Sequence, residues 1–220
     1  MRVSRGPVRA ALLAVGGSVL FACPAMEPAC CATQDPAAAG PPSEWVTIHE
    51  QVGDRPALPR AFPMVDADGA ALAEVPFTHR PAAIVFFYTR CTNPSKCPLL
   101  MRRFTLLRAR IEQLGLAEQI DTIAISYDAY RDHPEDLSRY RTALGPQAQG
   151  IRMLVPAPDT ANAFFTAWSV RAQTSREGVA AHTNELLLVD REGRLQQRNV
   201  VLLWDTDQVV QALRNLVTEP

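Results

Sequence analysis

The sequence predicts an α/β domain with a mostly parallel central sheet, a late β-hairpin and flanking helices. Short apolar runs rich in β-branched and aromatic residues alternate along the chain with longer segments of helical period. Glycine and proline residues separate these segments, as they do at the junctions of helices and strands. The last two strand-like runs flank a short acidic turn that ends in glycine, a pattern typical of a hairpin.

The expected elements begin with short strands. Residues 45–48 form the first strand candidate, and residues 61–65 lead into an acidic turn that ends at Gly69. The run 82–89 is apolar nearly throughout, as expected of a strand that is buried on both faces. These three segments place the first strands before any helix.

From Pro98 onward the apolar spacing becomes helical, and Gly115 is expected to end this helix. One face of the helix is marked by apolar residues, which are Leu99, Phe104, Leu107, Ile111 and Leu114. Residues 121–126 form the next buried strand. A second helix over residues 134–144 follows, with a proline in its first turn and Gly145 beyond its end.

The remaining elements complete the alternation. Residues 151–155 are expected to form a strand, and residues 159–168 a helix with Asp159 as its cap. The hairpin comprises residues 185–189 and 195–201, and Asp205 caps a final amphipathic helix. The resulting order, β-α-β-α-β-α-β-β-α, is thioredoxin-like. The sequence shows no internal repeat and no second domain.

Composition excludes a general nucleic-acid binder. The chain has 22 basic and 23 acidic residues, a formal charge of −1 and a pI near 6.4, so it has no basic excess to neutralise phosphates. Hydrophobic residues make up 47% of the chain, which is enough for a real core. A monomer is the default expectation.

The N-terminal segment predicts export. Residues 1–22 carry basic residues and then a short apolar run without acidic residues, which is the plan of a secretory signal. The run is shorter than the about 20 apolar residues that span a bilayer. It ends in Leu-Phe-Ala-Cys23, which resembles a bacterial lipobox, so Cys23 is the expected site of lipidation and of membrane anchoring in the periplasm. Ordinary cleavage nearby, with Cys23 left as a linker thiol, is the alternative.

A tether rich in Ala, Pro and Gly is expected over residues 23–43, before the folded domain of residues 44–220. The tether contains the vicinal pair Cys30 and Cys31. We interpret these as linker thiols, the alternative being an additional metal or redox site.

Cys91 and Cys97 carry the predicted chemistry. They bracket five residues, directly after a buried strand and directly before a helix. Unpaired N–H groups and the positive end of the helix dipole lower the pKa of a thiol at a helix N-terminus. Lys96 adds a positive charge that also favours thiolate. The loop between the cysteines contains Pro94 and can fold back to bring the sulfurs together.

His182 is the expected third partner among the chain's four histidines. It lies in a loop of small residues before a late strand, and a thioredoxin-like sheet places that loop against the first cysteine. Two thiolates and an imidazole form a soft site that suits copper(I) and also holds copper(II). Zinc is disfavoured because no second pair of closely spaced Cys or His ligands is present.

Three ordered segments carry a resemblance to a known family. They are Phe86-Phe-Tyr-Thr-Arg-Cys91 with Cys97-Pro98, Ser126-Tyr-Asp128-Ala-Tyr-Arg131-Asp132-His-Pro134-Glu135, and His182-Thr with Leu188-Val-Asp190-x-x-Gly193. Together they resemble the Sco/SenC family, the thioredoxin-like copper proteins of cytochrome c oxidase assembly.

The resemblance implies that Cys91, Cys97 and His182 bind copper and that Asp128 is a nearby acidic residue of the site loop. Lys96 is expected as a supporting residue because of its charge beside the cysteines. It also implies that the partner is a copper-receiving oxidase subunit or another copper carrier. The family's cysteines are usually separated by three residues, whereas five separate them here.

Two other hypotheses remain open. The first is a metal-independent thiol–disulfide oxidoreductase or redox sensor, in which Cys97, at the start of the helix, has the lower pKa and Cys91 is its partner. A copper protein could also reduce the cysteines of its target. The second hypothesis is a structural domain whose disulfide only staples a loop.

Overall fold

The computed structural model describes residues 49–51, 56–76, 79–200 and 203–218. The strands are β1 (His49–Gln51), β2 (Met64–Asp66), β3 (Ala71–Leu72), β4 (Ala82–Phe87), β5 (Asp121–Ser126), β6 (Arg152–Pro156), β7 (Ala172–Ser175), β8 (Gly178–His182), β9 (Leu186–Val189) and β10 (Leu195–Asn199). The helices are α1 (Cys97–Gln113), α2 (Pro134–Ala143), α3 (Ala161–Ala167) and α4 (Thr206–Thr218), and residues Pro146–Gly150 form a short 3-10 helix.

Eight strands form one sheet in the order β1-β10-β9-β4-β5-β6-β2-β3. The sheet is parallel at its centre, where β4 pairs with β5 and β5 with β6. Strand β9 joins β4 in the antiparallel direction and continues into β10 as a hairpin. The predicted α/β, thioredoxin-like fold with its late hairpin and flanking helices is confirmed.

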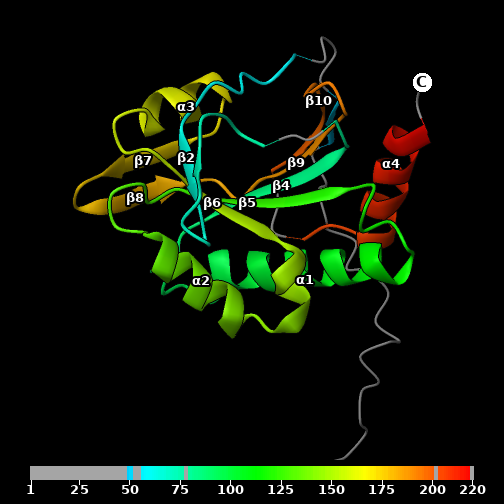
Figure 1. The fold of residues 1–220 in the computed structure, drawn as a ribbon, viewed down its shortest axis with the longest axis horizontal. Helices are drawn as coiled ribbons and strands as arrows, with labels where there is room; N and C mark the ends of the chain where they lie inside the picture. The colour runs from blue at the N-terminus through cyan, green and yellow to red at the C-terminus, as the bar shows by residue number, and fades with distance from the viewer. Residues whose placement is uncertain (1–48, 52–55, 77–78, 201–202, 219–220) are drawn as a thin grey trace, which may run out of the picture. The chain divides into compact units, whose positions relative to one another are not determined.

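Strand β4 divides the core into two layers because neighbouring strand residues point to opposite faces of a sheet. All six of its residues are buried. Phe86 packs against Phe164 and Trp168 of the α3 region, whereas the ring of Phe87 lies 5.3 Å from that of Tyr140 in α2. Helices α1 and α2 therefore lie on one side of the sheet and α3 on the other (Figure 1).

Helix α1 starts one residue earlier than predicted, at Cys97, and ends at Gln113 before Gly115, which has a φ of +69°. Its buried face is made by Cys97, Leu100, Met101, Phe104, Thr105, Leu107 and Ile111. The prediction that Leu99 and Leu114 belong to this buried face is wrong, because Leu99 is only half-buried and Leu114 is 39% exposed. Leu100 and Met101 occupy the turn that Leu99 was expected to fill.

Most other boundaries follow the sequence. Strand β5 has the predicted bounds, and the Asp205 carboxylate accepts a hydrogen bond from the backbone N–H of Gln208, as expected of a cap. The predicted cap of α3 is wrong, since Thr160 and not Asp159 precedes its first residue. The expected strand over residues 45–48 lies outside the described residues.

The largest difference concerns the residues before β9. The sequence predicts a loop around His182, but residues 172–182 form the antiparallel hairpin β7–β8. Most of its side chains are at least partly exposed, so the hairpin has no alternating apolar pattern to reveal it. Gly178, with a φ of +127°, starts its second strand.

The predicted signal over residues 1–22, the tether over 23–43 and the cysteines Cys23, Cys30 and Cys31 lie outside the described residues. None of the helices that the structure describes is long and apolar enough to cross a bilayer.

Candidate metal centre

The structure brings together the three residues that the sequence singles out. Cys91 follows β4, Cys97 begins α1 and His182 ends β8. One ligand atom from each residue, two sulfurs and one imidazole nitrogen, lies within 4.8 Å of the others. The site lies at the carboxyl end of the parallel strands, where open α/β sheets bind their ligands.

Hydrogen bonding sets the tautomer of His182. Its Nδ1 lies 3.1 Å from the carbonyl oxygen of Thr183. A carbonyl only accepts hydrogen bonds, so Nδ1 carries the proton and the neutral ring leaves the lone pair of Nε2 free. Nε2 lies 3.8 Å from Sγ of Cys97. The imidazole is therefore oriented as a ligand toward the sulfurs.

Two tyrosine rings enclose this imidazole. The ring of Tyr127 lies 4.9 Å from that of His182 in a tilted stack, and the ring of Tyr88 lies 5.5 Å away, edge to face. The Tyr127 hydroxyl donates to the Thr183 carbonyl at 2.5 Å. This carbonyl accepts from both the histidine and the tyrosine that stacks on it.

Burial lowers the pKa of His182, and the positive charge of Lys96 lowers it further against an opposing effect of the Thr183 backbone. The group therefore stays neutral at pH 7, as metal binding requires. Lys96 itself is exposed and precedes the first residue of α1. The expectation that Lys96 favours the thiolate stays a prediction, since Lys96 is not among the causes of the pKa shift of either cysteine.

The two thiols differ sharply. For half-buried Cys91, burial raises the pKa, but hydrogen bonds from the backbone of Cys97 and Asn93 and from the Tyr88 side chain outweigh it, so the pKa is lowered. For Cys97, which is fully buried, burial and the nearby charge of Cys91 raise the pKa to about 12. Cys91 is the thiolate-prone sulfur of the pair.

The sequence-based assignment of the lower pKa to Cys97 is therefore wrong. Its position at the helix N-terminus is as predicted, but loss of hydration penalises the charged form more than the helix terminus stabilises it. Cys91, one loop earlier, remains accessible to water and gains the hydrogen bonds.

Asp128 lies in the loop after β5 and is fully buried. Its Oδ2 pairs with the Arg131 guanidinium at 2.7 Å, and Arg131 also donates to the backbone carbonyl of Glu177. This pair fastens the site loop to the β7–β8 hairpin that carries His182. Within the described part of the chain, the cluster able to hold a metal does not include Asp128.

Asp132 has a structural role that the sequence analysis did not assign. Its carboxylate accepts from the backbone N–H of Thr89 at 3.0 Å, the Thr89 hydroxyl at 2.5 Å and the Ser126 hydroxyl at 2.6 Å. These bonds tie the segment before Cys91 to the end of β5. The residue lies inside the second family-like segment, so a signal for it was present.

Tyr88 and Tyr127 were also missed as site residues. Both lie inside segments quoted for the resemblance, next to Thr89 and Asp128, but an aromatic residue beside a buried strand is ordinarily a core residue. Their contact with His182 arises in the folded chain, where β9 pairs with β4 and the residues just before β9 come close to both tyrosine rings.

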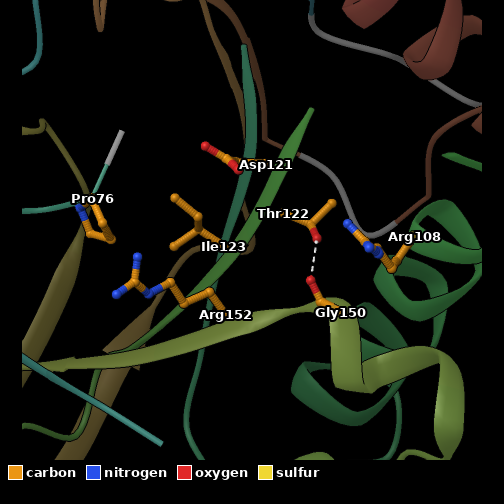
Figure 2. Close-up of a pocket in the computed structure, with 7 residues that line it drawn as sticks. All are labelled: Pro76, Arg108, Asp121, Thr122, Ile123, Gly150 and Arg152. Carbon is orange, nitrogen blue, oxygen red and sulfur yellow. Dashed lines mark hydrogen bonds between the residues drawn. The ribbon is translucent and has the colours of Figure 1, made fainter. Parts of the chain in front are cut away.

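A pocket at the other end of the parallel strands contains none of these residues. It is lined by the starts of β5 and β6, with Asp121, Thr122 and Arg152, and by Arg108 of α1 (Figure 2). The Thr122 hydroxyl donates to the Gly150 carbonyl at 3.1 Å. The pocket and the cysteine cluster therefore lie at opposite ends of the parallel strands.

The two cysteines are expected to react at very different rates. In a chain with Cys23, Cys30 and Cys31 replaced by serine, Cys91 should be alkylated by iodoacetamide on the order of 100-fold faster than Cys97 at pH 7.5. Its rate should rise with pH around a midpoint below 9.0, because its pKa is lowered from that value. Peptide mass spectrometry at timed intervals measures both. Equal rates in the folded protein, or faster labelling of Cys97, would contradict this assignment; equal rates in denaturant are the control.

Comparison with known proteins agrees with this architecture. The SCO1/SenC family model matches residues 50–218. A SCO1/SenC family lipoprotein from Bacillus anthracis superposes with a TM-score of 0.65 at 16% identity, over 74% of this chain and 95% of that one. Copper-bound yeast Sco1 gives 0.58 at 20% identity, over 72% and 90%.

BsSco is described as a member of the Sco family of cytochrome c oxidase assembly proteins with a disulfide switch. It gives a TM-score of 0.62 at 16% identity, over 74% of this chain and 95% of that one. No curated protein matches the chain significantly. Since the family model spans most of the chain and the structures share its fold, the chain belongs to the SCO1/SenC family.

Proposed function

We propose that this protein binds one copper ion through Cys91, Cys97 and His182 and delivers it during the maturation of a respiratory oxidase copper centre. The observation that carries the proposal is the convergence of two sulfurs and one imidazole nitrogen within 4.8 Å. The receiver is the copper-binding subunit of the oxidase or another copper carrier.

The donor set suits copper. Thiolates select copper(I), and an imidazole allows the same site to hold copper(II). In the metal-free protein the raised pKa of Cys97 keeps its thiol protonated, and this thiol faces the free Nε2 of His182. Copper binding therefore displaces the Cys97 proton, while His182 binds without losing one. Partial burial of the cluster limits access of water to the bound ion.

Membership in the SCO1/SenC family supports the proposed client. Yeast Sco1 binds copper, and BsSco belongs to a family of cytochrome c oxidase assembly proteins. The five-residue spacing between the cysteines still lets both sulfurs meet the histidine, so the longer loop is compatible with the same donor set.

We also propose that the protein is exported and held at the outer face of the cytoplasmic membrane. The signal-like residues 1–22, the lipobox-like cysteine Cys23 and the Ala/Pro-rich tether up to residue 43 support this placement. A copper-handling site also suits a compartment in which the receiving copper centre is assembled.

Thiol–disulfide exchange is the second candidate function. The asymmetry of the pair favours the first step, since the accessible Cys91 with a lowered pKa can attack a disulfide. The resolving attack by the buried Cys97 requires its thiol to lose a proton, and Nε2 of His182 lies 3.8 Å from its sulfur. Such a step could also keep the target's cysteines reduced before copper transfer.

Copper counting tests the proposal. A full chain with Cys23, Cys30 and Cys31 replaced by serine is reduced, loaded anaerobically with copper(I) and desalted. We expect about one copper per chain to be retained, and little after an additional Cys97→Ser or Cys91→Ser change. Absence of retained copper, together with rapid exchange with glutathione, would reject copper binding and leave the oxidoreductase function. Atomic absorption and thiol titration measure the two outcomes.

A further inference from the structure

A buried ion pair lies behind the histidine, outside the cluster of candidate ligands. Glu185 is 2% exposed and Arg198 is 8% exposed. Their side chains form a hydrogen-bonded salt bridge, and Arg198 also donates to the backbone carbonyl of Trp168 at 2.7 Å. Glu185 directly precedes β9. Arg198 lies in β10, where it pairs with Leu187 of β9.

Thr183 connects this pair to the site. Its hydroxyl donates to Oε1 of Glu185, while Arg198 binds Oε2 of the same carboxylate. The backbone N–H of Thr183 donates to the carbonyl of Arg171 at 3.1 Å. Thr183 is therefore fastened through both its side chain and its backbone, directly after His182.

The carbonyl of Thr183 is also the acceptor that sets the tautomer of His182. It receives Nδ1–H of the imidazole at 3.1 Å and the Tyr127 hydroxyl at 2.5 Å. The contacts thus form a continuous chain from Arg198 through Glu185 and Thr183 to His182. Any rotation of the Thr183 peptide would redirect or release the imidazole.

Stability alone accounts poorly for this arrangement. Removing two charges from water costs several kcal/mol per ion in typical proteins, and apolar residues of similar volume often replace a buried pair without loss. A fixed polar pair does, however, define one orientation for the groups bonded to it. Outer hydrogen-bond partners of metal-binding histidines commonly fix the tautomer and the direction of the ring.

We propose that the buried Arg198–Glu185 pair positions the metal-binding histidine, acting through the hydroxyl and carbonyl of Thr183. It holds His182 in the Nδ1–H tautomer with Nε2 directed at Cys97. Glu185, Arg198 and Thr183 are positioning residues that touch neither sulfur nor metal. The inference rests on the proposed copper site for its function, but the tautomer that it assigns exists in the metal-free protein.

Thr183→Val is the central test because it removes the hydroxyl while preserving shape. Thr183→Ser restores the hydroxyl, and Glu185→Gln breaks the charged link. Thr122→Val is the matched control: it too removes a threonine hydroxyl that donates a hydrogen bond, in this case to the Gly150 carbonyl, but Thr122 lines the pocket at the far end of the sheet (Figure 2). All variants are made in the chain that lacks the three N-terminal cysteines.

Two measurements are made on each variant. Nitrogen-15 NMR of the imidazole in the reduced, metal-free protein reports the His182 tautomer, and competition with a copper(I) chelator reports affinity. For Thr183→Val and Glu185→Gln we expect a mixture of tautomers and copper affinity about 10- to 100-fold weaker. Thr183→Ser and Thr122→Val should resemble the parent protein in both measurements.

The outcomes separate this inference from the proposed function. An unchanged tautomer and unchanged affinity in folded Thr183→Val would overturn the positioning role even if the parent protein binds copper. If Glu185→Gln fails to fold, Thr183→Val alone decides. If the parent protein retains no copper but its Nδ1–H tautomer is lost in Thr183→Val, the positioning inference stands and the copper function falls.

Discussion

Replacing His182 with alanine is expected to abolish retention of copper(II) and to leave copper(I) bound far more weakly. The change removes the nitrogen that lies 3.8 Å from Cys97 and leaves two sulfurs to hold the ion. The loss of affinity should exceed the about 10- to 100-fold that follows from disturbing an outer hydrogen-bond partner. Copper(II) binding followed by visible and EPR spectroscopy, and copper(I) binding by chelator competition, measure the effect.

The same variant distinguishes copper handling from simple dithiol chemistry. Cys91 and Cys97 remain, so exchange with glutathione should continue at a rate close to that of the parent protein. His133→Asn is the matched control, because His133 is exposed, precedes α2 and is not part of the site, and asparagine is favoured at this position. Full copper retention in His182→Ala would refute the assigned third ligand.

Asp132→Asn is expected to lower the free energy of unfolding by about 2–4 kcal/mol. The carboxylate is 1% exposed and accepts three hydrogen bonds, two of them from Thr89 and one from Ser126. An asparagine can face those donors with only one oxygen, and its amide group places a further donor against them. Urea unfolding followed by circular dichroism measures the change.

The loss of the Asp132 hydrogen bonds should also affect the metal centre. Thr89 lies two residues before Cys91, so a loosened Thr89 allows the first sulfur to move and should weaken copper binding in the variant that remains folded. Asp68→Asn is the control, since Asp68 makes an exposed ion pair with Arg141, and such pairs contribute less than about 1 kcal/mol. Similar destabilisation by both changes would argue against the buried role of Asp132.

Segments with a strong apolar pattern were predictable from the sequence. The apolar runs that form β4 and β5 are recognisable in the sequence, because a central strand is buried on both faces and needs apolar residues on each. The β7–β8 hairpin could not be found in this way, because its mostly polar and small side chains form no apolar face. Its pairing depends on backbone hydrogen bonds and on the anchorage supplied by Arg131.

The composition of the site was predictable, but its electrostatics were not. The strand-to-helix position of Cys91 and Cys97 and the location of His182 before a late strand were sufficient to bring the three together. Which of the two thiols has the higher pKa depends on burial. The full burial of Cys97 arises from the packing of α1, which no local sequence pattern predicts. Likewise, Arg198 bonds Glu185 and the Trp168 carbonyl, which lie 13 and 30 residues before it, and no local pattern indicates these contacts.

The distance along the chain between the candidate ligands has a consequence for the folded state. Cys97 and His182 are separated by 85 residues, so an ion held by both closes a long loop, as a reversible cross-link would. A ligand that binds only the native state at 100 times its dissociation constant adds about 2.7 kcal/mol of stability. The copper-bound protein should therefore unfold at a higher temperature and resist proteolysis longer than the metal-free protein. If the proposed function is correct, a protein that has transferred its copper would be less stable than the loaded one and more accessible to proteases and chaperones.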